Sequence, residues 1–200
     1  MEIIRFSELR PQPWRNGGGV TRELASHPRA ASAQDGAWDW RVSIAEVSKA
    51  GPFSVFPGME RVITVIDGEL LLLSVDGAEH PLEKYRPFRF SGEAASAGAL
   101  PTGDIKDLNV ITRQGSFKGY ISIIELSKKR AHPLFGGQLG VLLQGQATVS
   151  PGTAGMGEPE TLGRYDAVVG SDADSPEILG RGFLAVVSID AVGPSAGSED

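Results

Sequence analysis

The chain of 200 residues contains no cysteine, and this absence excludes two kinds of chemistry. A disulfide framework cannot form, and a thiolate nucleophile cannot act. A globular chain of this length buries about 70% of the surface of its unfolded form. A hydrophobic core can therefore hold the fold without a disulfide or a metal.

Long apolar runs and an excess of positive charge are also missing. Apolar runs such as Leu70–Leu73 are too short to span a bilayer, and the first 14 residues lack the apolar stretch of a signal peptide. A cytoplasmic protein without a membrane partner is expected. The formal net charge of −6 and the pI near 5.1 argue against a nucleic-acid partner, which needs a concentrated basic face. A local arginine in a buried site can still attract a small anionic metabolite.

The three histidines, His27, His80 and His132, do not have the spacing of metal ligands. Each is followed by a proline, which predicts a turn or loop at all three positions. We therefore expect neither a metal nor another cofactor. No G-x-S-x-G or S-x-x-K sequence marks a nucleophilic serine, and no pair of carboxylates stands out as an acid–base dyad.

Glycine, by contrast, is abundant: it makes up 26 of the 200 residues, nearly double its usual share of ~7%. The glycines are dispersed between short apolar runs. This pattern of short apolar runs separated by glycine predicts an all-β fold of short strands. Apolar and polar residues alternate clearly over 38–47, and Asp67-Gly68 predicts a hairpin between two strands. Further strands are expected at 105–112, 117–126, 139–149, 165–169 and 182–190.

A weak internal repeat relates the two halves of the chain. Gly68 matches Gly145 at an offset of 77 residues, and Tyr85 matches Tyr165 at an offset of 80. A period near 80 residues suits two stacked copies of a small β-barrel unit.

Three consecutive glycines, Gly17–Gly19, stand in the sequence PWRNGGGVTRE. They do not match a phosphate-binding loop, because no lysine follows them and the next residues favour a strand rather than a helix. A β-bulge or a tight turn accounts for them without any ligand.

The stretch 51–70 resembles the first sequence motif of the cupins, in which two histidines and a glutamate bind a metal. Counting back from Gly68, Arg61 takes the place of the glutamate, and the places of the histidines fall within residues 54–57. In the second motif, Lys106 takes the place of the histidine. Such an exchange favours an anion over a metal cation.

Arg61 is expected on the same strand face as Ile63 and Val65. An inward-facing arginine needs a partner, and a ligand carboxylate would be one. The alternative is an arginine at the mouth of a barrel that reaches solvent or pairs with Glu60 or Asp107.

A second polar face is predicted within residues 104–115, where Asp107, Asn109, Ile111 and Arg113 alternate with apolar residues. Asp and Asn are poor strand formers, so two of them in one strand call for an explanation. Either the strand begins with a turn, or the two side chains line a polar ligand pocket.

Four ordered motifs together resemble the HutD/Ves family of bacterial cupin-like proteins. They are WRNGGGVTRE (14–23), WRVSIAEV (40–47), GPFSVFPGMERVITVIDGE (51–69) and GDIKDLNVITRQG (103–115). The resemblance extends to about residue 190 and weakens after 130. It implies a bicupin with an N-terminal barrel over 1–130 that holds the candidate pocket. A C-terminal barrel over 131–190 would be completed by strands from the N-terminal region, and 191–200 would form a disordered tail.

HutD-type members accompany histidine utilisation and are associated with N-formylglutamate, an intermediate with two carboxylates, whereas the Ves branch is linked to cold and stress responses. The resemblance thus implies a non-enzymatic regulatory protein that binds an anionic metabolite. The candidate ligand-binding residues are Arg61, Arg15, Asn16, Asn109, Asp107, Trp14 and Ser54.

Two alternatives stay open at this point. A metal-independent isomerase or hydrolase would need a convergent acid and base, for which Glu46 and Asp107 are candidates. A structural protein would use its barrels only to form a homodimer through sheet edges. Residues 151–160 carry neither a basic nor an aromatic side chain, so the second half is expected to be scaffold.

Overall fold

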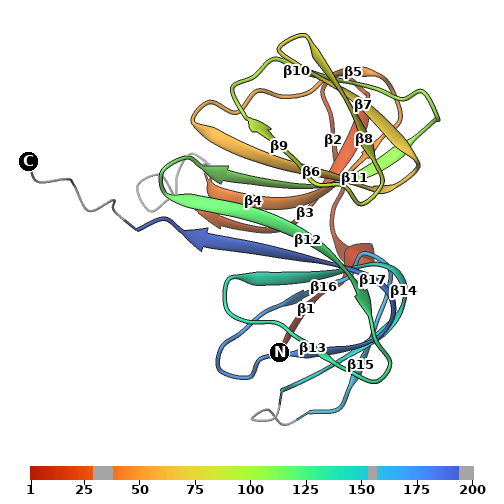
Figure 1. The fold of residues 1–200 in the computed structure, drawn as a ribbon, viewed down its shortest axis with the longest axis vertical. Coiled ribbons are helices and arrows are strands. Elements are labelled where there is room, and N and C mark those ends of the chain that lie inside the picture. The colour runs from red at the N-terminus through yellow and green to blue at the C-terminus, as the bar shows by residue number, and fades with distance from the viewer. Residues whose placement is uncertain (29–37, 153–156, 194–200) are drawn as a thin grey trace, which may run out of the picture.

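The computed structural model describes residues 1–28, 38–152 and 157–193, and within these ranges the chain forms strands and one short 3-10 helix, η1 (Phe6–Glu8). Two β-barrels are stacked, with the N-terminal barrel above the C-terminal one in Figure 1. Among the described residues there is no helix of the length and apolarity that a membrane crossing requires.

The N-terminal barrel consists of two antiparallel sheets. The first contains, in order, β2 (Gln12–Pro13), β3 (Gly19–Pro28), β4 (Trp38–Val47), β11 (Ile105–Arg113), β6 (Met59–Asp67) and β9 (Phe88–Ser91). The second contains β5 (Gly51–Pro52), β10 (Ser96–Ala99), β7 (Leu70–Val75) and β8 (Ala78–Glu83). Buried side chains from both sheets, such as Ile63 and Val65 from one and Leu71 and Leu73 from the other, form its core.

The C-terminal barrel is a single seven-stranded sheet. Its main path runs β1 (Glu2–Ile4), β16 (Ala167–Val169), β14 (Gln138–Ser150), β17 (Glu177–Ala191) and β12 (Phe117–Leu126). The short strands β13 (His132–Pro133) and β15 (Glu160–Leu162) pair with β17 and β14, respectively. Fully buried leucine, valine and isoleucine side chains fill its interior, among them Leu134, Leu142, Val149, Ile178 and Leu184.

Alternation along the central strands sends their side chains to two different cores. The even-numbered residues Val42, Val62 and Val110 face the second barrel and pack in a cluster that includes Val141 and Ala185. The odd-numbered residues of the same strands face the interior of the first barrel. Both faces of β4, β6 and β11 are therefore covered, and the odd-numbered positions are those that can line a cavity.

The chain passes from the six-stranded sheet of the first barrel to the seven-stranded sheet of the second between β11 and β12. β12 lies within residues 1–130, the range predicted for the first barrel, but it pairs with β17 along its whole length. β1 pairs with β16, so the described chain begins in the sheet of the second barrel. Of the tail predicted at 191–200, residues 194–200 lie outside the described residues.

The hairpin predicted at Asp67-Gly68 is not formed. β6 pairs with β11 and β9, whereas β7 pairs with β8 and β10, so the turn carries the chain from one sheet of the barrel to the other. Gly68 has a φ of +79°, and a Cβ atom there would lie 2.7 Å from the carbonyl oxygen of Asp104. An Asp-Gly pair favours a tight turn, but long-range pairing decides which sheet the next strand joins.

The prediction of turns or loops at the three histidines is also wrong. His27 lies in β3, His80 in β8 and His132 in β13, so each belongs to a different sheet. Proline after a histidine is compatible with a strand when it stands at a strand end or on an edge strand, as β8 and β13 are.

The internal repeat corresponds to matched backbone geometry in the two barrels. Tyr85 and Tyr165 both adopt positive φ, +67° and +69°, which is uncommon for a bulky residue. The Tyr85 N–H donates to the carbonyl oxygen of Val65 at 2.8 Å, and the Tyr165 N–H donates to that of Leu142 at 2.6 Å. The same turn thus recurs in both copies of the barrel, as a bicupin requires.

Replacing Gly145 by alanine should destabilise the second barrel. Gly145 has a φ of +101° and lies opposite Gly182, and a Cβ atom would collide with the carbonyl oxygen of Arg181. The matched control is Gly77→Ala, at a φ of +84° with no atom within 4 Å of the added carbon. We expect Gly145→Ala to lose about 2 kcal/mol more than Gly77→Ala in urea unfolding. Equal losses would contradict the role assigned to the close contact.

Candidate functional site

A cavity of about 400 Å³ opens inside the N-terminal barrel. Its wall consists of the inner face of the six-stranded sheet, the β2–β3 connection and the segment that follows β5. All seven candidate residues line it: Trp14, Arg15, Asn16, Ser54, Arg61, Asp107 and Asn109. The structure thus brings together residues from four separate stretches of the sequence, and their role in binding stays a prediction.

The glycine triplet forms the tight turn between β2 and β3. Gly17 has a φ of +66°, and the N–H of Gly18 donates to the side-chain oxygen of Asn16 at 2.9 Å. A Cβ atom on Gly19 would collide with the carbonyl oxygen of Glu46 in β4, so glycine allows the two strands to approach. The same turn holds Asn16 at the rim of the cavity.

Trp14 is fixed on one side of the cavity by two contacts. Its indole N–H donates to the hydroxyl of Thr21 at 2.8 Å, and its ring meets Phe53 edge-to-face with centroids 5.7 Å apart. Both partners also line the cavity. Trp14 therefore contributes a rigid apolar wall, because its polar atom is already satisfied within the protein.

Two arginines lie at the same level of the sheet. Arg61 on β6 is opposite Ile111 on β11, and Ile111 is in turn opposite Arg41 on β4. Both guanidinium groups belong to the cavity lining and flank β11. This pair forms the cationic end of the cavity.

The polarity changes along the strands away from the two arginines. Asn109 precedes Ile111 by two residues on β11 and is opposite Ser43 on β4. Asp107 precedes Ile111 by four residues and is opposite Ala45. All four side chains line the cavity. The lining therefore passes from a cationic end through a neutral polar middle to an acidic end, and the backbone positions of Ile111 and Asp107 are roughly 13 Å apart along the strand.

Arg61 is buried at 4% exposure and is poorly satisfied by the protein. One of its terminal nitrogens donates to the carbonyl oxygen of Ser54 at 3.3 Å, whereas its Nε is buried and has no partner within the described ranges. The guanidinium lies 5.8, 5.4 and 5.0 Å from the ring centroids of Phe53, Phe56 and Phe90. These rings stabilise the charge in part but supply no acceptor.

The alternatives to an inward-facing Arg61 do not apply in this structure. Its burial excludes an arginine that reaches solvent at the barrel mouth. Glu60 pairs instead with Arg89, and among the described residues Arg61 makes no ion pair with Asp107. Burial lowers the pKa of the Arg61 guanidinium to about 10; the charge of Asp107 opposes this shift and that of Arg41 adds to it. The group remains cationic at neutral pH.

Arg41 is a cavity residue that the sequence reasoning missed. It is half-buried, and its guanidinium lies 4.9 Å from the ring centroid of Trp38. Its Nε has no partner in the part of the chain that the structure describes. Burial lowers its pKa, and the charge of Glu23 opposes that shift. The signal was present in the alternation of residues 38–47, which places Arg41 and Ser43 on one face.

Asp107 lies at the acidic end and is 1% exposed. The side-chain amide of Asn109 donates to its Oδ1 at a long 3.5 Å, and the Asn109 Oδ1 is itself buried with no partner among residues 1–28, 38–152 and 157–193. Burial raises the pKa of Asp107 to about 7, although the charge of Arg61 and the Asn109 hydrogen bond oppose this shift. Its carboxyl group therefore changes charge near neutral pH.

A family model for HutD matches residues 6–186 of the chain. The chain belongs to the HutD family. This family is linked to histidine utilisation, and the chain is 38% identical to Protein Ves from Escherichia fergusonii over 144 residues, which cover 70% of this chain and 71% of that protein.

Solved structures confirm the fold of this HutD-family protein. HutD from Pseudomonas fluorescens SBW25 matches with a TM-score of 0.75 and 28% identity, covering 96% of this chain and 99% of that one. Vicilin from hazelnut, Corylus avellana, matches with a TM-score of 0.60 at 8% identity, covering 95% and 85% of the two chains, and shows the fold alone. The prediction of an all-β bicupin is confirmed.

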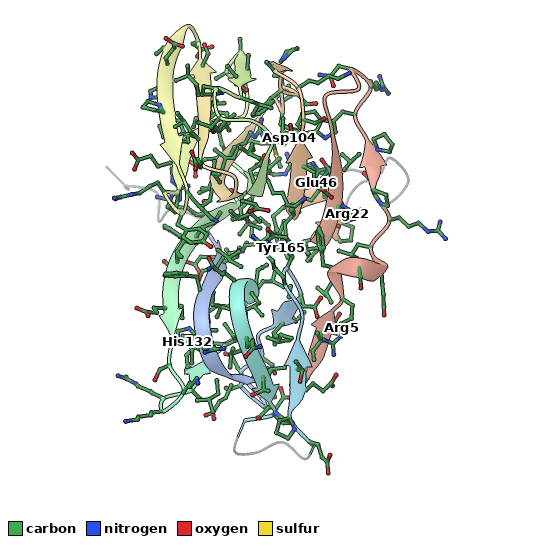
Figure 2. All side chains as sticks on the ribbon, turned by 90° about the vertical axis from the view of Figure 1, so that its right-hand side faces the viewer. Arg5, Arg22, Glu46, Asp104, His132 and Tyr165 are labelled. Atoms are coloured by element: carbon green, nitrogen blue, oxygen red, sulfur yellow. The ribbon has the colours of Figure 1, made fainter. Side chains whose placement is uncertain are left out.

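Lys106 and Glu46 lie outside the HutD-family cavity. Lys106, at the position of a cupin histidine, donates to Glu46 at 2.6 Å, and Arg22 pairs with the same carboxylate. Arg22 and Glu46 lie side by side near the junction of the barrels (Figure 2). The expectation that an amine replaces a metal ligand inside the site is therefore wrong, because alternation turns Lys106 away from the face that carries Asp107. Glu46 and Asp107 likewise do not converge.

The donor set of the cavity does not fit the metal that many cupins hold. Its charged groups are guanidinium groups, which cannot ligate a cation, and a single carboxylate, Asp107. Within residues 1–28, 38–152 and 157–193, no group of three or more histidine, cysteine or acidic side chains could hold a metal ion. The charged side chains of this cavity fit an anion better than a metal cation.

Proposed function

We propose that this HutD-family protein is a non-enzymatic regulatory protein of histidine utilisation that binds an anionic intermediate such as N-formylglutamate in the cavity of its first barrel. The observation that carries the proposal is Arg61, a buried cation whose Nε has no partner among the residues that the structure describes. A buried charge is costly unless it is paired and hydrogen-bonded. A ligand carboxylate would supply the missing acceptors.

The charge of the cavity supports this ligand class. The lining contains Arg15, Arg41 and Arg61 against one carboxylate, Asp107, although the whole chain carries a net charge of −6. A dicarboxylate can offer one group to each of the two buried guanidinium groups, which recognise carboxylates through paired hydrogen bonds.

The placement of the acidic groups favours binding over catalysis. Proton transfer in an isomerase or hydrolase requires an acid and a base that reach the same substrate. In the described lining Asp107 is the one carboxylate, and Glu46 is held outside by Arg22 and Lys106. No acid–base pair of carboxylates is assembled among these residues.

A thermal-shift screen with N-formylglutamate, glutamate, urocanate and histidine tests the proposal. A ligand that binds only the folded state stabilises it by about 2.7 kcal/mol at a hundredfold excess over Kd, which corresponds to roughly 5–10 °C for a chain of this size. We expect such a rise with N-formylglutamate and none with histidine, whose amine would meet two guanidinium groups. No rise with any of the four compounds would reject the proposal and favour a role of the kind implied for the Ves branch.

A further inference from the structure

The inner end of the cavity holds two hydrogen-bond acceptors that the binding of carboxylates does not use. Asp107 receives one long side-chain hydrogen bond, from the Asn109 amide at 3.5 Å. The Asn109 Oδ1 is buried and has no partner in the part of the chain that the structure describes. Because buried acceptors in folded proteins are nearly always satisfied, two such groups side by side call for donors from outside the protein.

These acceptors lie on the same wall of the cavity as the two arginines, but at a different position along the strands. Asn109 is two residues from Ile111 along β11, and Asp107 is four residues from it, whereas Arg61 and Arg41 flank Ile111 itself. A ligand whose carboxylates contact the guanidinium groups would therefore direct its remaining polar group towards Asn109 and Asp107.

We infer that Asp107 and Asn109 form a specificity subsite for the N–H group of an N-acylated amino dicarboxylate. This inference rests on the proposed function, because it assumes that the arginines hold the carboxylates. Asn109 can accept from the ligand N–H through its Oδ1, and Asp107 offers a second acceptor beside it. A plain dicarboxylate would leave the Asn109 Oδ1 without a donor and Asp107 with the long hydrogen bond from Asn109 alone.

The surrounding charges favour a neutral amide over an ammonium group as that donor. Arg61 on β6 and Arg41 on β4 both face the cavity, so together with Asp107 the buried part of the lining carries an excess of positive charge. An ammonium group would be repelled by both guanidinium groups and would lose more hydration on burial than an amide does. The subsite thus separates acylated from free amino dicarboxylates.

Isothermal titration of the full chain with a matched ligand pair tests the inference. The pair is N-formylglutamate and 2-formyloxyglutarate, in which oxygen replaces the N–H and both carboxylates are kept. We expect the N–H compound to bind at least about tenfold more tightly, because the ester leaves buried acceptors unpaired. In the double variant Asp107→Leu/Asn109→Leu, which removes both acceptors, this preference should fall to about twofold or less, whereas Asp107→Asn, which keeps both acceptors, should retain most of it.

Asp104→Leu serves as the control, since Asp104 is exposed and lies outside the cavity, and it should leave the preference unchanged. Equal binding of the two compounds to the natural chain would overturn the subsite and leave the proposed function standing. The same holds for a preference that persists in a folded Asp107→Leu/Asn109→Leu double variant. Failure of the natural chain to bind either compound would overturn the proposed function and this inference together.

Discussion

Arg61→Met is expected to weaken the binding of N-formylglutamate at least about 100-fold and, at the same time, to raise the free energy of unfolding. The loss follows from removing a buried charged partner of the ligand, an effect that commonly amounts to 2–5 kcal/mol. The gain follows because the natural chain keeps a cation at 4% exposure whose Nε has no acceptor among the described residues. Methionine has a similar length and no charge, and we expect it to add about 2 kcal/mol of stability.

Titration calorimetry and urea unfolding of the same preparation measure both effects. Arg86→Met is the matched control, because Arg86 is exposed and is not part of the cavity lining, and it should change neither quantity. Arg61→Lys keeps the charge but loses the forked donor geometry, so its affinity should fall between those of the natural chain and Arg61→Met. Undiminished affinity in Arg61→Met would show that the ligand does not use this residue.

Asp107→Asn is expected to stabilise the protein increasingly as the pH rises from 4 to 7. In the unfolded chain the carboxyl group has its ordinary pKa of 3.8, and in the folded protein burial raises the pKa to about 7. Between these values the folded state keeps a proton that the unfolded state has lost, so this group makes the natural chain less stable as the pH increases. The full effect is about 4 kcal/mol above pH 7 and disappears below pH 4.

Urea unfolding of the natural chain and the variant at pH 4.5, 6 and 8 measures this difference. Groups other than Asp107 titrate in both proteins and cancel in the comparison. Asp104→Asn, a substitution of an exposed carboxylate, should follow the pH profile of the natural chain. Parallel profiles for the natural chain and Asp107→Asn would show that the carboxyl group is not buried as described.

The sequence alone predicted the strands well wherever alternation was regular. Residues 38–47 form β4 over the same range, and Asp107, Asn109 and Ile111 share one face as expected. This success has a physical basis, because side chains two residues apart on a strand always face the same side. The seven candidate residues also proved to line one cavity, since the resemblance to a known family supplied the long-range arrangement that alternation cannot.

The failures concern contacts between distant parts of the chain. The hairpin expected at Asp67-Gly68 did not form, because local sequence cannot tell whether the next strand pairs with the previous one or joins the opposite sheet. Lys106 was placed in the site by counting from a motif, whereas its alternation with Asp107 turns it outward to Glu46. Arg41 was missed because its strand has two buried faces, and the sequence does not say which of them encloses the cavity.

Leucine, valine and isoleucine side chains fill the second barrel. This filling determines how the occupancy of the chain would depend on ligand concentration under the proposed function. Only the first of the two barrel interiors, as far as the structure describes them, offers polar groups to a ligand. Occupancy of one such site per chain rises along a simple hyperbola, since cooperativity requires at least two coupled sites. Under the proposed function, such a chain would report the metabolite concentration over a wide range, and a sharp threshold would have to arise from coupling between separate chains.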